Sequence, residues 1–372
     1  MRIGFDAKRA FFNFSGLGNY SRNTIAYLGS KYPENEYHLY IPRRKLRIPN
    51  GEMSKYSLEY PQSWTGRKLS SFWRSYWLGK RLEKDRIDLY HGLSNEIPFD
   101  LPRPKVRSVV TIHDLIFMRY PEWYKPIDRK IYVKKAKHAC KEADRIIAIS
   151  NQTSSDIQEY TGTSPDRIDV VHQGCDPVFY SPVSEDGKKQ LKQKYSLPSD
   201  YILYVGTIEP RKNLLKIVQA LHSGSLDIPL IIIGRATPYI ETVREFIGEH
   251  GMKNIRFLKD VPNEDLPGLY QMAQIFVYPS RFEGFGIPIL EALASRTPVI
   301  TSAGGVFPEA GGSSSAYIDP DSPEELVESI RKILDNSTLH DSMREQGFQH
   351  AMRFTEDIIA RNIMDVYKKA LK

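Results

Sequence analysis

Short apolar runs alternate with longer helical patterns along all 372 residues, and this alternation constrains the fold more than any other feature. The runs lack strict polar alternation, which is typical of strands buried on both faces. Strands that alternate with helices form parallel sheets covered by helices. We therefore predict an α/β fold of two doubly wound, Rossmann-like domains, with strands in the ranges 1–7, 36–42, 87–92, 105–114, 143–150, 167–174, 200–207, 229–235, 255–261, 274–280, 297–302 and 315–319.

The segment 176–201 is rich in Pro, Ser and charged residues, so we expect the linker between the domains there. We predict a first domain over 1–182, a second over 183–354, and a final helix over about 355–372 that packs back on the first domain. Ligands of open parallel sheets bind at the carboxyl ends of the strands. Two such domains facing each other would place a cleft between these ends.

The composition favours a soluble protein of a reducing compartment. The longest apolar run, "IPLIIIG" at 228–234, is too short to span a bilayer, and "MRIGFDAKRAFF" lacks the apolar stretch of a signal peptide. Cys140 and Cys175 are too few and too isolated for a disulfide framework or a metal cage. We expect a cytoplasmic location.

Positive charge is concentrated in the first half, where residues 1–182 hold 30 Lys and Arg against 20 Asp and Glu. The stretch 63–84, "SWTGRKLSSFWRSYWLGKRLEK", mixes aromatic and basic residues. Such a stretch suits an anionic membrane surface or an anionic acceptor, but aromatic stripes at helical spacing are more often core. Nucleic acid is the least favoured partner, because no helix-turn-helix, zinc or base-stacking signature is present.

The range 204–221, "YVGTIEPRKNLLKIVQAL", reads as strand, loop and helix, with Arg211 and Lys212 at the start of the helix. Cations there oppose the positive end of the helix dipole and cost roughly 0.3–1 kcal/mol each. A diphosphate between the helix and both side chains would reverse this sign. The pattern indicates an anion site, unless both side chains point into water.

The range 274–301 repeats the order of strand, loop and helix. Gly284 and Gly286 let backbone amides approach a ligand, and Pro288 suits the first helical turn. Glu283 in the loop can accept hydrogen bonds from sugar hydroxyls, and we expect Glu291, one turn into the helix, to face back toward the loop. A carboxylate in that position also favours the helix dipole without any ligand.

Two loops of the first half could complete a site. Gly16 and Gly18 precede a helix where a dinucleotide fingerprint would lie, but Ser21 occupies the third glycine position, which disfavours a dinucleotide-dependent oxidoreductase. His113 ends a buried strand, where polar side chains are often functional, and His91 is a secondary candidate at a similar strand end.

No cluster of residues has the spacing of metal ligands. Asp319 and Asp321 stand before a helical pattern with further acids in its first turn, so we interpret them as part of a helix cap. We expect no metal and no other cofactor.

Together, the motifs "SGLGNYSRN", "TIHD", "VGTIEPRKN", "RFEGFGIPILEALA" and "TPVITS" resemble the retaining glycosyltransferases of family four, which have a GT-B-type fold. The resemblance covers nearly the whole chain, and the pair Glu283 and Glu291, with seven residues between them, matches the hallmark of that family. Within the family, the sequences of the motifs "VGTIEPRKN" and "SGLGNY" most resemble those of bacterial mannosyltransferase-like enzymes of surface polysaccharide synthesis.

The resemblance implies roles for four candidate catalytic residues. Arg211 and Lys212 would hold the donor diphosphate, Glu283 would contact the transferred sugar, and His113 would lie near the sugar and the phosphate. Some family members carry an Arg where this chain has Thr207, so the diphosphate would rest on fewer cations here.

The resemblance also implies donor-binding residues. Glu291 would hold the ribose hydroxyls, and the loop at Gly16 and Gly18 would approach the phosphate or the acceptor. The remaining donor-binding candidates are Gly284, Phe285, Gly286 and Ile287.

The implied activity is retaining, metal-independent transfer of a sugar from a nucleotide sugar, with GDP-mannose as the expected donor, to a glycan or lipid-linked acceptor. The family implies attack on the face that the diphosphate leaves, without a separate general base. A UDP-sugar is the alternative donor, and a non-catalytic nucleotide-sugar-binding partner in polysaccharide assembly is the alternative class. Peripheral association with the inner face of the membrane is a hypothesis that the basic, aromatic stretch suggests.

Overall fold

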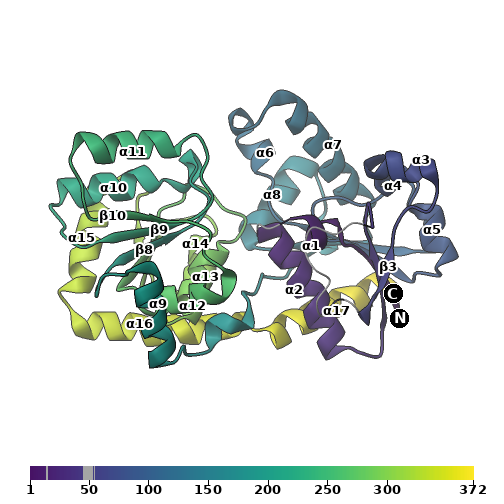
Figure 1. Ribbon diagram of the computed structural model, residues 1–372. Helices are drawn as coiled ribbons and strands as arrows, with labels where there is room; N and C mark the ends of the chain where they lie inside the picture. Colours follow the sequence, from purple (N-terminus) through teal and green to yellow (C-terminus); the bar gives the residue numbers. More distant parts are fainter. Residues whose placement is uncertain (14–15, 45–52, 54) are drawn as a thin grey trace. The chain divides into compact units, whose positions relative to one another are not determined.

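A computed structural model describes residues 1–13, 16–44, 53 and 55–372 (Figure 1). The chain divides into two compact units, unit 1 with Met1–Gly174 and Glu356–Lys372, and unit 2 with Cys175–Thr355. Each unit is built on one parallel sheet. The predicted α/β class with two doubly wound domains is thereby confirmed.

The sheet of unit 1 has seven strands in the order β3-β2-β1-β4-β5-β6-β7. The order reverses between β1 and β4, so the loops that follow these two strands leave the sheet toward opposite faces. The strands are β1 (Arg2–Asp6), β2 (Glu36–Tyr40), β3 (Ser57–Glu59), β4 (Leu89–Gly92), β5 (Arg107–Ile112), β6 (Arg145–Ala148) and β7 (Ile168–Val170). The helices are α1 (Lys8–Phe12), α2 (Gly16–Lys31), α3 (Trp64–Lys68), α4 (Ser70–Tyr76), α5 (Gly79–Lys84), α6 (Ile116–Arg119), η2 (Pro121–Trp123), α7 (Pro126–Glu142), α8 (Asn151–Thr161), η3 (Pro165–Arg167) and α17 (Glu356–Leu371).

Two separate apolar clusters cover the two faces of this sheet. On one face, α1, α2 and the C-terminal helix α17 pack on alternate residues of the strands, such as Ile3 and Phe5 of β1. On the other face, α4, α5, α7 and α8 pack on the intervening residues, such as Tyr90 of β4. Burial of each large apolar side chain stabilises the unit by about 1.5–3 kcal/mol. The last helix therefore belongs to the core of unit 1, although it follows unit 2 in the sequence.

The sheet of unit 2 has six strands in the order β10-β9-β8-β11-β12-β13, which reverses between β8 and β11. The strands are β8 (Ile202–Val205), β9 (Leu230–Ile233), β10 (Ile255–Leu258), β11 (Ile275–Tyr278), β12 (Val299–Ser302) and β13 (Ala316–Ile318). The helices are η4 (Pro177–Tyr180), α9 (Glu185–Tyr195), η5 (Pro210–Lys212), α10 (Leu214–Ser223), α11 (Ile240–Glu249), η6 (Asn263–Asp265), α12 (Leu266–Gln271), α13 (Ile287–Ala294), α14 (Phe307–Gly311), α15 (Pro323–Leu334), α16 (Ser337–Ala351) and η7 (Met352–Phe354).

Helices α10, α11 and α15 share one apolar cluster with alternate residues of the unit 2 strands, including Ile202 and Tyr204 of β8. Figure 1 shows α10 and α11 on one side of β8, β9 and β10, with α9 on the other side. Ser322 caps α15 by accepting a hydrogen bond from the backbone of Glu325 at 3.2 Å, so Ser322 rather than an aspartate is the capping residue.

All twelve predicted strands are present, and the structure adds the three-residue strand β3. The division between the units falls between Gly174 and Cys175 rather than after residue 182. The reason is that η4 packs inside unit 2, where the ring of Phe179 lies 5.8 Å from that of Tyr270. Among the described residues, none of the helices combines the length and the apolar character that a bilayer span requires.

Candidate functional site

The candidate site of unit 2 lies where its strand order reverses, between β8 and β11. Arg211 and Lys212 stand in η5, between β8 and α10. Pro210 suits the first position of η5, and Asn213, with a left-handed φ of 61°, ends the turn before α10 begins. The backbone of Arg281 donates a hydrogen bond to the carbonyl of Arg211 at 2.9 Å, so the loops that follow β8 and β11 are joined.

Glu283 is the centre of this site. Its Oε1 atom accepts hydrogen bonds from Ser280 Oγ at 2.7 Å and from the Tyr278 hydroxyl at 2.9 Å. The same oxygen is paired with Lys212 Nζ, and with Arg211 Nη1 at 3.0 Å. The side chains of Glu283, Lys212 and Arg211 are 11%, 12% and 20% exposed, so these charges are mostly removed from water. We refer to these five residues as the Glu283 cluster.

The charges of the Glu283 cluster fix its protonation. Burial alone would raise the pKa of Glu283, but Lys212 and Arg211 outweigh burial and lower this pKa to about 2. Arg211 is also paired with Glu209 at 2.7 Å. Glu283 is therefore ionised at neutral pH, where it can accept hydrogen bonds from hydroxyls but cannot supply a proton. Arg211 and Lys212 can bind an anion.

The loop after Glu283 leads directly into α13. Gly286 has a φ of 108°, and a Cβ atom there would lie 3.1 Å from Ile289 Cδ1, so the backbone requires glycine at this position. The predicted donor-binding residues Gly284, Phe285, Gly286 and Ile287 thus form one turn of chain at the N-terminus of α13. Such a terminus favours negative charge.

Glu291 lies one turn inside α13, and the structure gives it partners that the sequence did not indicate. Its carboxylate accepts a hydrogen bond from the Tyr270 hydroxyl on α12 at 3.0 Å. Burial raises the pKa of Glu291 to about 7, the hydrogen bond from Tyr270 opposes this, and Asp176 adds to it. The contacts described for Glu291 place it beside Tyr270 rather than in the Glu283 cluster. The two glutamates therefore have opposite pKa shifts.

His113 of unit 1 is buried directly after β5. Its Nε2 atom lies 2.9 Å from the carbonyl oxygen of Leu93, and its Nδ1 atom lies 2.8 Å from the side-chain nitrogen of Gln173. The ring of Tyr20 packs edge-on against it at 4.6 Å. Burial lowers the pKa of His113 to about 4, against the opposing effect of the Leu93 carbonyl. His113 is therefore neutral near pH 7, with Nε2 donating to Leu93 and Nδ1 accepting from Gln173.

His91, the secondary candidate, connects three elements of unit 1. Its ring nitrogens lie 2.6 Å from the Tyr367 hydroxyl on α17 and 2.8 Å from Thr111 Oγ1 on β5. Thr111 Oγ1 is also 2.8 Å from the hydroxyl of Tyr20 on α2. Burial lowers the pKa of His91 to about 3. This network holds α2 and α17 against the sheet, which is a structural role.

The glycine loop of unit 1 opens α2, which begins at Gly16. A Cβ atom on Gly18 would lie 2.0 Å from the carbonyl oxygen of Asn13, so only glycine permits this close approach of the backbone. Arg22, further along α2, donates to the carbonyl oxygens of Ala10 at 2.8 Å and Asn13 at 3.0 Å. Arg22 thereby fixes the start of the helix to the chain before it.

The residues of these sites that were not predicted include Tyr270, Ser280, Tyr278 and Gln173. Tyr278 at the end of β11 and Ser280 just after it both reach Glu283. They are two residues apart in the predicted strand 274–280, and this spacing places two side chains on the same side of a strand, so the sequence could have indicated them. Gln173 ends the predicted strand 167–174 in the same way.

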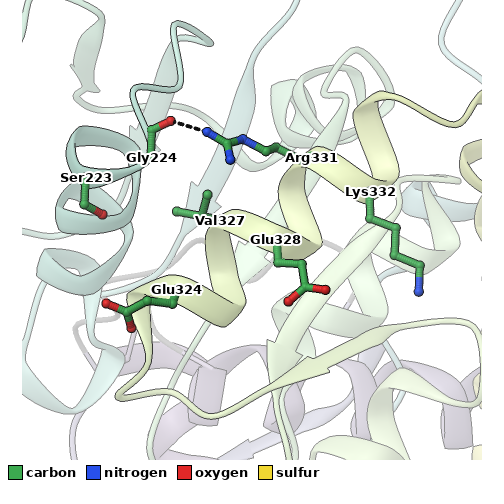
Figure 2. A pocket seen from close by; sticks show the side chains of 7 residues that line it. All are labelled: Ser223, Gly224, Glu324, Val327, Glu328, Arg331 and Lys332. Carbon is green, nitrogen blue, oxygen red and sulfur yellow. Dashed lines mark hydrogen bonds between the residues drawn. The ribbon is translucent and has the colours of Figure 1, made fainter.

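A surface hollow of unit 2 lies apart from these residues (Figure 2). It is lined by the end of α10 and by one side of α15, where Arg331 Nη2 donates to the carbonyl oxygen of Gly224 at 2.7 Å. Glu324, Glu328 and Lys332 also line it, so both signs of charge are present. In the described part of the chain, three or more His, Cys, Asp or Glu side chains do not come together as metal ligands.

Two doubly wound parallel-sheet units, one of which holds a buried carboxylate and two cations at its strand reversal, are the architecture of proteins of the GT-B type. The family model "Glycosyltransferase Family 4" matches residues 14–179, and "Glycosyl transferases group 1" matches residues 187–350. The O-antigen chain mannosyltransferase B of Escherichia coli is 33% identical to this chain over 288 residues, which are 75% of this chain and 74% of that protein. The chain belongs to glycosyltransferase family 4 and is a glycosyltransferase that acts on a nucleotide sugar.

Solved structures agree with this fold. A glycosyltransferase from Rickettsia africae ESF-5 has a TM-score of 0.79 at 18% identity, with 100% of this chain and 98% of that chain covered. HepE of Anabaena, solved with UDP and glucose, has a TM-score of 0.78 at 17% identity, with 99% and 100% covered. At these identities the likeness establishes the GT-B fold alone.

Proposed function

We propose that this glycosyltransferase moves mannose from GDP-mannose to a glycan or lipid-linked acceptor, with retention of the anomeric configuration and without a metal ion. The mannose donor is supported by the name of the O-antigen chain mannosyltransferase B of Escherichia coli. The same name supports an acceptor that belongs to a surface polysaccharide.

The Glu283 cluster is the observation that carries this proposal. Glu283 is paired with Arg211 Nη1 and with Lys212 Nζ, so a diphosphate that binds these cations competes with Glu283 for them. When the diphosphate takes the place of Glu283 on these cations, the carboxylate of Glu283 needs other hydrogen-bond donors. The hydroxyl groups of the sugar can provide them. One cluster thus accounts for recognition of both the diphosphate and the sugar.

The chemical step follows from the same charges. The bond between the anomeric carbon and the diphosphate oxygen breaks, the acceptor oxygen bonds to the same face of that carbon, and the acceptor proton passes to the leaving diphosphate. The pKa of Glu283, about 2, makes its carboxylate a weak base, and both ring nitrogens of His113 are engaged by Leu93 and Gln173, so neither residue is placed as a general base.

The negative charge that develops on the leaving diphosphate is stabilised by Arg211, Lys212 and the N-terminus of α13. Removal of one well-placed donor of this kind commonly costs about 3 kcal/mol in the transition state. Because these groups offset the charge of the diphosphate, the proposed reaction does not require a divalent cation.

The test is a donor panel in the presence of a chelator. The full chain is incubated with GDP-, UDP- and ADP-sugars and with octyl α-mannoside as a simple acceptor, and release of nucleoside diphosphate is measured. We expect turnover with GDP-mannose and an α-linkage in the product by NMR. Turnover with UDP-sugars alone would establish the alternative donor class, a β-linkage would contradict retention, and turnover only with added metal would contradict metal independence.

A further inference from the structure

We propose that unit 1 binds anionic lipid bilayers through one composite surface, the α4–α7 surface, made of Phe72, Tyr76, Trp77, Phe99, Ile127 and Ile131 with the lysines around them. This proposal deepens the lipid-linked acceptor of the proposed function by naming where the membrane is bound. Neither the donor nor the sugar enters the argument for it.

Apolar side chains are exposed on unit 1 in two stretches that are far apart in the sequence. Nine of the 13 exposed large apolar side chains among the described residues lie within residues 63–84 and 121–142. In the first stretch they are Trp64, Leu69, Phe72, Tyr76 and Trp77. In the second they are Trp123, Ile127, Ile131 and Tyr132, and Ile127 is 75% exposed.

The first stretch separates its residues between the core and the surface. Trp73, Leu78 and Leu82 are buried in the cluster that covers the sheet. Phe72 and Trp77, in contrast, are 44% and 41% exposed. A core role therefore explains only the inner side of α4 and α5, and the outer side is left apolar and in contact with water.

A series of ring contacts joins α4 to α7. Phe72 stacks on Tyr76 at 4.6 Å, Tyr76 stacks on Phe99 at 4.9 Å, and Phe99 stacks on His138 of α7 at 4.1 Å. Lys134 of α7 also lies over the ring of Phe99, at 5.4 Å.

The exposed isoleucines of α7 belong to the side of the helix that these rings reach. Ile127, Ile131, Lys134 and His138 are spaced by four, three and four residues, which places them on one face of a helix. Because His138 and Lys134 contact Phe99, the isoleucines belong to the same surface, which runs about 16 Å along α7 from Ile127 to His138 at 1.5 Å per residue.

The two halves of the surface are anchored to one point. Glu96 is paired with Arg74 of α4 at 2.6 Å and with Lys135 of α7 at 2.6 Å. Arg74 is also paired with Asp6 at the end of β1. Both helices pack on the same face of the sheet. The α4–α7 surface is therefore a fixed part of unit 1.

Charge favours an anionic bilayer over other occupants. Residues 63–84 and 121–142 together hold 13 Lys and Arg against 4 Asp and Glu, and nine of these basic residues are exposed against three acidic ones. A second copy of the chain bound by the same surface would bring like charges together. Aromatic and isoleucine side chains enter the interfacial region of a bilayer while lysines reach the anionic headgroups.

The test uses the full chain and vesicles of phosphatidylglycerol and phosphatidylcholine. The apolar variant Ile127→Gln/Ile131→Gln and the charge variant Lys130→Glu/Lys134→Glu alter α7 only at exposed positions. Phe72→Gln/Lys68→Glu tests the other half of the surface if an α7 variant does not fold by circular dichroism. The matched controls are in unit 2, Met352→Gln for the apolar change and Lys189→Glu/Lys192→Glu on α9 for the charge change.

We expect wild type and controls to sediment with anionic vesicles at about 0.1 M salt and to be released at about 1 M, where the screening length is about 3 Å. We expect each surface variant to bind at least tenfold more weakly. Equal binding to neutral vesicles, no binding to anionic ones, or unchanged binding of the variants would overturn the proposal. If the protein does not bind vesicles but forms a dimer in light scattering, and only the apolar variant is a monomer, the occupant of the surface is a second copy of the chain instead.

Thermal stabilisation by GDP-mannose is measured in parallel without vesicles. Failure of membrane binding and failure of the donor assignment are therefore distinguishable.

Discussion

The sheets of the two units have the same strand order, which reverses between corresponding strands. The ion pairs at the two reversals differ in how far they are exposed to water. At the reversal of unit 1, Asp6 and Arg74 form an ion pair whose side chains are 2% and 5% exposed. At the reversal of unit 2, Glu283 and Arg211 are 11% and 20% exposed. A sealed pair fixes the elements around it, whereas a partly accessible pair can exchange one partner for an incoming anion. The same topology thus provides an anchor in one unit and the proposed donor site in the other.

The buried titratable groups of the two units differ as well. In unit 1, burial lowers the pKa of His91 to about 3 and of His113 to about 4, so both are uncharged at neutral pH. In unit 2, burial raises the pKa of Glu291 to about 7. The units should therefore respond to acid in opposite directions.

The largest expected effect compares the two ion pairs. Asp6→Asn leaves the buried Arg74 paired with Glu96 but without Asp6, and removal of one partner of a buried pair costs about 3–5 kcal/mol. We expect a loss near the upper end for Asp6→Asn and near the lower end for Glu283→Gln, because the Glu283 cluster is more accessible to water. Urea unfolding of both variants checks this. Equal losses would show that the difference in exposure has no energetic weight.

The next effect concerns catalysis in unit 2. Lys212→Met removes one cation from the proposed diphosphate site but leaves Glu283 bonded to Arg211, Ser280 and Tyr278. We expect kcat/KM to fall by about 100- to 1000-fold, with little change in the unfolding transition. Lys189→Met on α9 is the matched control. A fall below tenfold would argue against the assignment of Lys212.

The third prediction separates the units by pH. The unfolded state binds more protons than folded His91 and His113 at pH 5, so unit 1 should lose about 2 kcal/mol for each histidine between pH 7 and pH 5. Folded Glu291 binds more protons than the unfolded state in that window, so unit 2 should gain about 2 kcal/mol. Glu283 contributes only below about pH 4.5, where the stability that its low pKa provides is lost as pH falls.

The four tryptophans, Trp64, Trp73, Trp77 and Trp123, all lie in unit 1, so fluorescence reports unit 1 while circular dichroism reports both units. Glu291→Gln should abolish the gain of unit 2 without altering the fluorescence transition. Transitions that shift in the same direction on acidification would contradict this prediction.

The smallest effect concerns the partner of His113. Gln173→Glu places a carboxylate beside His113 Nδ1, which should raise the pKa of the histidine from about 4 by one unit or more, equivalent to about 1.4 kcal/mol. NMR titration of the imidazole protons measures this, with Gln190→Glu on α9 as the control. An unchanged pKa would mean that burial alone sets the charge of His113.

Local sequence was sufficient for the strands and for the position of Arg211 and Lys212, because Pro210 and Asn213 define their turn within four residues. The three-residue strand β3 was missed because "SLE" carries too little apolar pattern. The partners of the site residues depend on which strands and helices are neighbours. Tyr270 reaches Glu291 only because α12 lies beside α13, and Gln173 reaches His113 across 60 residues of sequence.

The central claim is that a diphosphate takes the place of Glu283 on Arg211 and Lys212. Calorimetric titration of GDP, with a chelator present, into wild type, Lys212→Met and Glu283→Gln tests it directly. The exchange predicts that Lys212→Met binds GDP at least tenfold more weakly and that Glu283→Gln, which has no competing carboxylate, binds it more tightly than wild type. Weaker binding by both variants, or binding that appears only when metal replaces the chelator, would contradict the claim.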